Sequence, residues 1–127
     1  MQQRNIYNYA VIRVVPLVER EEFVNTGIIL FCKKQKYIKV MVKMREQMIL
    51  AFKPDAELDE IAANLEAFRK IAAGEPEGGP IAALDIPERF RWLTALRSAT
   101  IQTSRPHPGI CYDLDETLNN LFREMVE

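Results

Sequence analysis

The chain has 127 residues, the length of one domain, so we expect a single domain over residues 1–127. Its 48% hydrophobic and 28% charged residues, with a formal net charge of −1, are the balance of an ordinary globular protein. The longest clean apolar run, Ile28–Cys32, is far too short to cross a bilayer, and the start MQQRNIYNY lacks the layout of a signal peptide. We therefore expect a cytoplasmic protein that does not enter a membrane.

The first third of the chain predicts three antiparallel strands in a meander. Tyr7–Val15 carries apolar residues on both alternating faces, which is typical of a central strand covered on both sides. Phe23–Cys32 is the second strand, with Gly27 as a bulge or a point of close approach. The polar run Lys33–Lys36 predicts a hairpin loop, and Tyr37–Met44 is the third strand.

The rest of the chain is mainly helical by its 3.6-residue periodicity and its capping residues. The predicted segments, in chain order, are a short helix at Met48–Phe52, a helix from Pro54-Asp55 to just before Gly74, a loop at Gly74–Pro80, a helix capped by Asp85, a short strand at Ala99–Ser104, a loop at Arg105–Gly109 and a helix capped by Asp113. The predicted fold class is α+β, with an antiparallel sheet of three long strands plus one short strand. We expect three to four helices, packed mainly on one side of the sheet.

The net charge is distributed unevenly along the chain. Residues 1–54 carry ten Lys/Arg and four Asp/Glu, a net +6, whereas residues 55–127 carry seven and fourteen, a net −7. The simplest explanation is that a basic sheet packs against acidic helices. The alternative is a basic surface that binds an acidic partner.

A short polar strand followed by a rigid loop is the first candidate site. Side chains alternate along a strand, so the polar residues of Ala99–Ser104 should share one face, either as a wet edge or as the floor of a site. The only histidine, His107, follows between two prolines that hold the loop extended. The candidate binding residues in this part of the chain are Arg97, Thr100, Gln102, Ser104 and His107.

Arg13 is a charged residue in the middle of a strand that is otherwise apolar on both faces, so it needs a partner. The acidic connection that follows could supply one from Glu19, Glu21 or Glu22. Arg13 and Asn25, in the neighbouring strand, complete the set of candidate binding residues. A buried pair of this kind is found both in functional sites and in purely structural networks.

No metal or cofactor is expected. The nearest approach to a metal site is His107 with Cys111 and Asp113, which lacks the paired ligands at fixed spacing that zinc sites use. Cys32 and Cys111 are expected to be free thiols, as is usual in a cytosolic protein.

Two separated segments resemble a known family. YNYAVIRVVP with the later EFVNTGIILFC, and ERFRWLTALRSATIQTSRPHPG, are similar to the bacterial family catalogued as domain of unknown function 3037. The family has no established activity, so the resemblance implies no catalytic residues. Its members are often encoded beside HipA-like serine/threonine kinases, which implies a kinase-like protein partner.

Three functional hypotheses follow from the sequence, which does not decide whether the protein is an enzyme. The first is a non-catalytic protein-interaction or regulatory module, because the chain has no complete catalytic set. The second is a small enzyme that uses Arg97, Gln102 and His107. The third, less favoured because the sequence pI is about 5.9, is nucleic-acid binding through the basic stretch Lys33–Arg45. A homo-oligomer is compatible with each.

Overall fold

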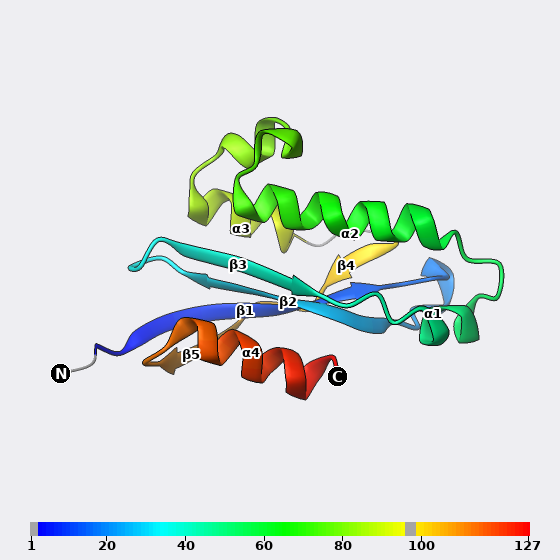
Figure 1. The fold of residues 1–127 in the computed structure, drawn as a ribbon, viewed down its shortest axis with the longest axis horizontal. Helices are drawn as coiled ribbons and strands as arrows, with labels where there is room; N and C mark the ends of the chain where they lie inside the picture. Colours follow the sequence, from blue (N-terminus) through cyan, green and yellow to red (C-terminus); the bar gives the residue numbers. More distant parts are fainter. Residues whose placement is uncertain (1–2, 96–98) are drawn as a thin grey trace.

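The computed structural model describes residues 3–95 and 99–127, and its centre is a five-stranded antiparallel sheet (Figure 1). The strands are β1 Asn5–Val14, β2 Val24–Cys32, β3 Tyr37–Val42, β4 Ile101–Thr103 and β5 His107–Cys111. The helices are α1 Glu46–Phe52, α2 Leu58–Ala73, α3 Ile86–Leu93 and α4 Leu114–Met125, with short 3-10 turns at Val18–Arg20, Pro76–Gly78 and Pro80–Ala83. The predicted α+β class is confirmed. In the described part of the chain, no helix has the length and apolar character needed to span a membrane.

Strand β1 is the spine of the sheet. It pairs with β2 along one side, and on its other side with β4 opposite Ile12–Val14 and with β5 opposite Asn5–Tyr9. Its neighbours on both sides and the helices on both faces bury it, as the sequence predicted: Val11 is 7% exposed and Ile12 is fully buried. The order of the long path is β3-β2-β1-β4, with β5 added beside β1.

The prediction of a loop at Arg105–Gly109 is wrong in part, because His107–Cys111 forms strand β5. Prolines are tolerated at the edge of a sheet, where the missing N–H can face away from the ladder. Gly109 lies directly opposite Tyr7, and a Cβ at this position would collide with the Tyr7 ring. The absence of a side chain at Gly109 therefore leaves room for the Tyr7 ring to lie across β5.

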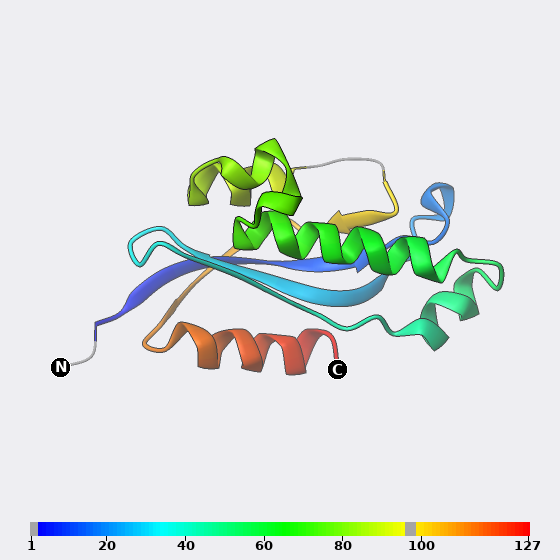
Figure 2. The same cartoon turned by 45° about the horizontal axis from the view of Figure 1, so that its top comes forward.

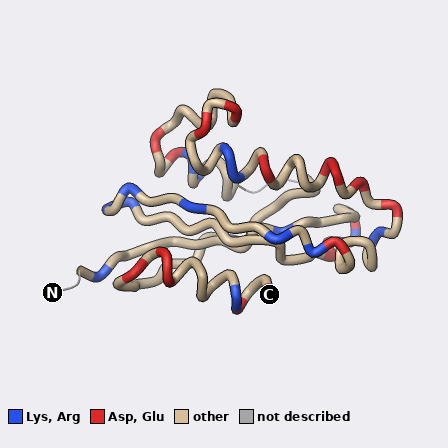
Figure 3. Tube along the Cα trace, viewed as in Figure 1, with Lys and Arg blue, Asp and Glu red and all other residues tan. Residues whose placement is uncertain are grey.

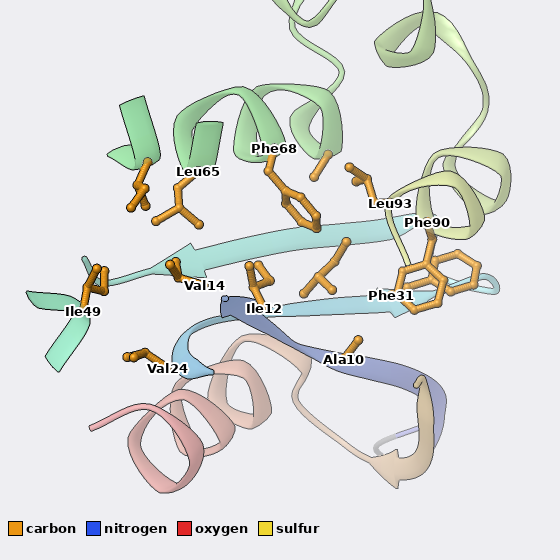
Figure 4. Close-up of a cluster of buried hydrophobic side chains, with 13 residues drawn as sticks. Ala10, Ile12, Val14, Val24, Phe31, Ile49, Leu65, Phe68, Phe90 and Leu93 are labelled. Atoms are coloured by element: carbon orange, nitrogen blue, oxygen red, sulfur yellow. The ribbon is translucent and has the colours of Figure 1, made fainter. Parts of the chain in front are cut away.

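The two faces of the sheet carry separate apolar cores, which makes a three-layer arrangement (Figure 2). Helices α2 and α3 cover one face, where α1 adds Ile49 to the same core (Figure 4). Helix α4 covers the other face with Leu118 and Phe122. Three of the four helices thus contribute to one core, as expected, and α4 alone covers the opposite face.

A bulge in β2 lets this strand serve both cores. Gly27 pairs with Ile12 and Asn25 pairs with Arg13, so Thr26 is the extra residue between them. Thr26 is fully buried, and its hydroxyl donates a hydrogen bond to the Ile12 carbonyl at 3.2 Å. Because the bulge shifts the alternation by one residue, Val24 reaches the α2 core while Ile28 reaches the α4 core.

The helix boundaries follow their local chemistry, with one correction. The long helix begins at Leu58 rather than at Pro54-Asp55, because residues 53–56 form a turn in which the Ala56 N–H bonds the Lys53 carbonyl. Gly74 ends it in the left-handed conformation, with φ of 73°. Asp85 and Asp113 cap α3 and α4, each by accepting a hydrogen bond from the N–H three residues on. These caps were predicted from the sequence.

Basic residues of β3 meet acidic residues of α4 and the chain end, as the simpler explanation of the charge distribution predicted (Figure 3). Lys39 Nζ lies 3.4 Å from Asp115 Oδ1, and Lys43 Nζ lies 3.8 Å from the Glu127 carboxylate. The Tyr37 hydroxyl donates to Asp115 Oδ1 at 2.7 Å. This hydrogen bond lowers the pKa of Asp115, while burial and the same bond raise the pKa of Tyr37.

We expect Gly27→Ala to lower the free energy of unfolding by about 1–3 kcal/mol, the usual cost of overpacking. A Cβ at this position would lie 2.5 Å from the Met41 carbonyl oxygen, which is backbone and cannot turn aside. Urea unfolding measures the change. Lys36→Gly is the control: Lys36 has φ of 51°, so glycine there should not destabilise the protein. A Gly27→Ala protein as stable as the parent would contradict the close approach.

Tyr37→Phe should destabilise the protein at pH 7 by less than about 1 kcal/mol, because the Asp115 carboxylate is exposed and screened by solvent. The folded pKa of Asp115 lies below its unfolded value of about 3.9, so its stabilisation is present above that value. That stabilisation is lost as pH falls through the folded pKa. Urea unfolding at pH 7 and near pH 2 should therefore show a gap between Tyr37→Phe and the parent that narrows in acid. A constant gap would exclude the carboxylate as its cause.

Candidate functional site

Three of the predicted binding residues lie in one row across three strands. In the register of the sheet, Arg13 of β1 is directly opposite Asn25 of β2 on one side and Gln102 of β4 on the other. Arg13 lies two residues after Val11 on β1, so its side chain is on the face of the sheet that α4 covers. The fold therefore brings together residues that are up to 89 positions apart in the chain, which sequence spacing alone could not show.

The partner of Arg13 is an aromatic ring. Its guanidinium carbon lies 4.0 Å from the centre of the Phe23 ring, a cation–π contact. The expected ion pair with Glu19, Glu21 or Glu22 is not found among the described residues, and Glu22 pairs with Arg20 instead. Burial lowers the pKa of Arg13, and its Nε is buried without a hydrogen-bond partner in the described part of the chain.

Asn25 connects the row to the end of helix α4. Its Nδ2 donates to the Met125 carbonyl at 3.0 Å, and its own carbonyl accepts a 3.5 Å hydrogen bond from Arg45. The last carbonyls of a helix have no partner within the helix, so Asn25 satisfies one of them. These contacts give Asn25 a structural task at the α4 terminus.

Two residues of the predicted polar segment, Gln102 and Ser104, use their side chains to bond backbone groups of the protein. The Gln102 side-chain amide donates to the Ala99 carbonyl at 2.7 Å. The Ser104 hydroxyl, which is buried, accepts a hydrogen bond from the Val11 N–H at 2.9 Å and donates to the Arg105 carbonyl. Ser104 thus continues the pairing with β1 beyond the end of β4.

Thr100 and Gln102 also line a cavity of about 260 Å³ between α2, α3 and β4. Its other walls include Asn64, Phe68 and Trp92. His107 does not line it. His107 pairs with Tyr9, four residues from Arg13 along β1, which at about 3.3 Å per residue is roughly 13 Å away.

Gln102 and His107, the two described residues of the enzyme hypothesis, therefore do not share a pocket. His107 is exposed and its ring lies 5.4 Å from the Tyr9 ring, while Gln102 belongs to the Arg13 row. Arg97 lies outside the described residues. Within the described ranges, no three His, Cys, Asp or Glu side chains gather as metal ligands. Cys32 is buried, Cys111 is half-buried, and both are free.

An exposed apolar surface at the β5 end of the sheet was not predicted. Ile6 of β1 and Ile110 of β5 face each other across the ladder and are 70% and 59% exposed. Ile6 shares the face of Ala10 and Ile12, which α2 and α3 cover further along the strand. The alternation that predicted burial of both faces is present at Ile6, but no described helix covers this end.

A groove of about 560 Å³ adjoins these isoleucines. It is lined by Arg4, Ile6, Asn8, Phe31, Lys33 and Lys34. We call these residues together with Ile110 the open sheet face. Phe31 forms its boundary with the core, because its ring stacks on Phe90 of α3 with 4.7 Å between centroids (Figure 4). The open sheet face therefore continues the apolar face of the sheet beyond α3 and ends in a basic rim.

The model of the family described as protein of unknown function (DUF3037) matches residues 9–126, so the chain belongs to this family. The match confirms the resemblance found in the sequence. No curated protein and no solved structure matches the chain.

Ser104→Ala should lower the free energy of unfolding by about 1–3 kcal/mol, because it leaves the buried Val11 N–H without its acceptor. Chemical denaturation measures the change. Thr103→Ala is the matched control at the neighbouring position, the last residue of β4, since no hydrogen bond of its side chain is found among the described residues and it is only half-buried. Equal effects of the two substitutions would show that the Ser104 hydroxyl does not act through Val11.

Proposed function

We propose that this member of the family is a non-catalytic protein-interaction module that docks a protein partner through the open sheet face. The observation that carries the proposal is the exposure of the Ile6–Ile110 pair on a regular β-ladder. Burying an isoleucine side chain contributes about 1.5–3 kcal/mol, so leaving two of them adjacent in water is unfavourable unless something covers them. Exposed apolar surface with a polar rim is typical of protein interaction sites.

The competing hypotheses have less support from the geometry. Gln102 and His107 belong to different parts of the sheet, which does not favour a shared active site. In the basic stretch Lys33–Arg45, Lys39 and Lys43 are paired with carboxylates, and Arg45 contacts the Asn25 carbonyl. These contacts leave fewer cations of the stretch for phosphates. Lys33 and Lys34 have no ion pair within the described residues, but they line the groove beside exposed Ile6, and this apolar neighbour favours a protein partner.

A HipA-like kinase is the first partner that we propose to test, and the cytoplasm is the compartment in which we place the interaction. Both come from the sequence and from the family resemblance. The open sheet face supplies the docking surface for such a partner and requires no chemistry from this chain.

The double substitution Ile6→Thr/Ile110→Thr should abolish partner binding and leave the fold intact. Threonine keeps the branched side chain that suits a strand, and both positions are exposed, so each change should alter stability by less than about 0.5 kcal/mol. Binding is measured by titration calorimetry against a purified HipA-like kinase from the same genome and by affinity purification at native expression. Circular dichroism and the melting temperature report the fold.

Met48→Gln is the matched control, because Met48 is a 42% exposed apolar residue on α1, at the opposite end of the sheet from β5 (Figure 1). It should bind the partner as the parent does. If the folded double variant retains every stoichiometric partner of the parent, the open sheet face is not the docking surface. If the parent itself recovers none, the interaction module is the wrong class of function.

A further inference from the structure

The open sheet face also indicates what kind of segment covers it. We infer that its occupant is an amphipathic helix with an acidic flank, contributed by a different protein and seated beside α3. This inference rests on the proposed docking function and adds the chemistry and the secondary structure of the partner. Three observations support it: the positive charge of the rim, the prolines at the β5 edge and the stacking of Phe31 on Phe90 of α3.

The rim of the groove is basic throughout. The ionisable side chains that line it are Arg4, Lys33 and Lys34, and all three are exposed. Within the described residues none of them forms an ion pair, in contrast to Lys39 and Lys43 further along β3. Complementary charge at a rim steers association and fixes orientation. The occupant should therefore carry Asp or Glu where its flank meets Arg4 and the hairpin lysines.

The outer edge of β5 is a poor template for an added strand. Strand addition depends on main-chain hydrogen bonds along a free edge. Pro106 and Pro108 have no N–H to donate, and prolines on an edge strand discourage such pairing. A partner is therefore better accommodated on the face of the sheet than at its edge.

Helix α3 already packs on this face of the sheet and provides an example of how a second helix could bind there. Phe90 of α3 stacks on Phe31 of β2, and the same Phe31 forms one wall of the groove. A second helix beside α3, at the usual interaxial distance of about 8–10 Å, would extend the helical layer over Ile6 and Ile110. Its apolar stripe would meet the two isoleucines and its acidic flank would meet the basic rim.

A second copy of the chain does not fit this surface as well. In a two-fold dimer the same patch forms both sides of the contact, so the basic residues Arg4, Lys33 and Lys34 of both copies would gather at one interface, and the described groove lining has no acidic residue to pair with them. Like charges brought together at an interface oppose association. A different protein with acidic residues satisfies both the apolar centre and the rim.

The experiment places a photo-crosslinking amino acid at position 110 of the full chain and, as the matched control, at position 48 on α1. Irradiation in the native host, followed by mass spectrometry, identifies the segment attached at each position. We expect position 110, and not position 48, to attach to a helix of another protein with apolar residues at i, i+3, i+4 and i+7 and an acidic flank. The partner identified in this way is then purified for the charge test.

The charge test uses Lys33→Glu/Lys34→Glu, with Lys36→Glu as the control because Lys36 does not line the groove. The double substitution should weaken binding of the purified partner at least tenfold, and the control should change it less than threefold. Replacing the acidic flank of the partner helix with lysines should restore binding to the double variant. Melting temperatures confirm that each variant is folded.

The outcomes separate this inference from the proposed function. Crosslinking to a basic or neutral segment, or to a strand, overturns the inference and leaves the docking function in place. Crosslinking to a second copy of this chain also overturns it, in favour of self-association. A double variant that binds the identified partner as tightly as the parent removes the role of the basic rim. No protein crosslink at position 110 overturns both proposals.

Discussion

The pairing of β1 on both of its sides is the constraint on which the rest of the structure depends. On one side it holds β2, and on the other it holds β4 and β5 in succession. The two short strands come from the far end of the chain and are joined to the sheet through β1 alone. Because β5 leads directly into α4, the same pairing places α4 over its face of the sheet.

The bulge at Thr26 divides the apolar residues of β2 between the two cores. A regular strand would send Val24 and Ile28 to the same face, because side chains alternate with a period of two. With one extra residue between them, Val24 packs under α2 and Ile28 under α4. The Thr26 hydroxyl and carbonyl are both bonded, to Ile12 and Lys43, so the bulge leaves neither group unsatisfied. The result is a thin sheet with a continuous core on each side.

The helices cover one face of the sheet more completely than the other, and the uncovered part is the surface proposed to bind a partner. Helix α4 packs against the face that carries Tyr7, Tyr9 and Val11. On the other face α3 reaches Phe31, and the sheet continues beyond it with Ile6 and Ile110 in water. The charge distribution follows the same division, since the lysines of β3 beside α4 are paired while those at the hairpin tip are free within the described residues. A surface that is apolar at its centre and basic at its rim suits an acidic protein partner.

The neighbours of Arg13 come from distant parts of the chain, so residue spacing along the sequence does not predict them. The sequence predicts a partner for Arg13 because it is a charge in an apolar strand. That partner is the Phe23 ring rather than a glutamate, because the short connection turns its acids outward to Arg20 and to solvent. Asn25 and Gln102 join Arg13 only through strand register. The alternation of the polar segment predicts Ser104 on a polar face, as part of a wet edge or of a site floor, whereas its buried hydroxyl bonds the Val11 N–H of β1.

The sequence by itself determined the family and the local features. These features are the three-strand meander, the close approach at Gly27, the caps at Asp85 and Asp113 and the end of a helix at Gly74. Each of these depends on residues close together in the chain, whose periodicity and backbone preferences act without distant partners. Only the tertiary structure decided that His107–Cys111 is a strand, that Asn25, Arg13 and Gln102 form a row, and that Ile6 is exposed. The physical reason is that strand partners and helix cover are non-local. Ile12 and Ile6 lie on the same apolar face of β1, but Ile12 is buried because helices cover it, and Ile6 is exposed because no described helix lies above it.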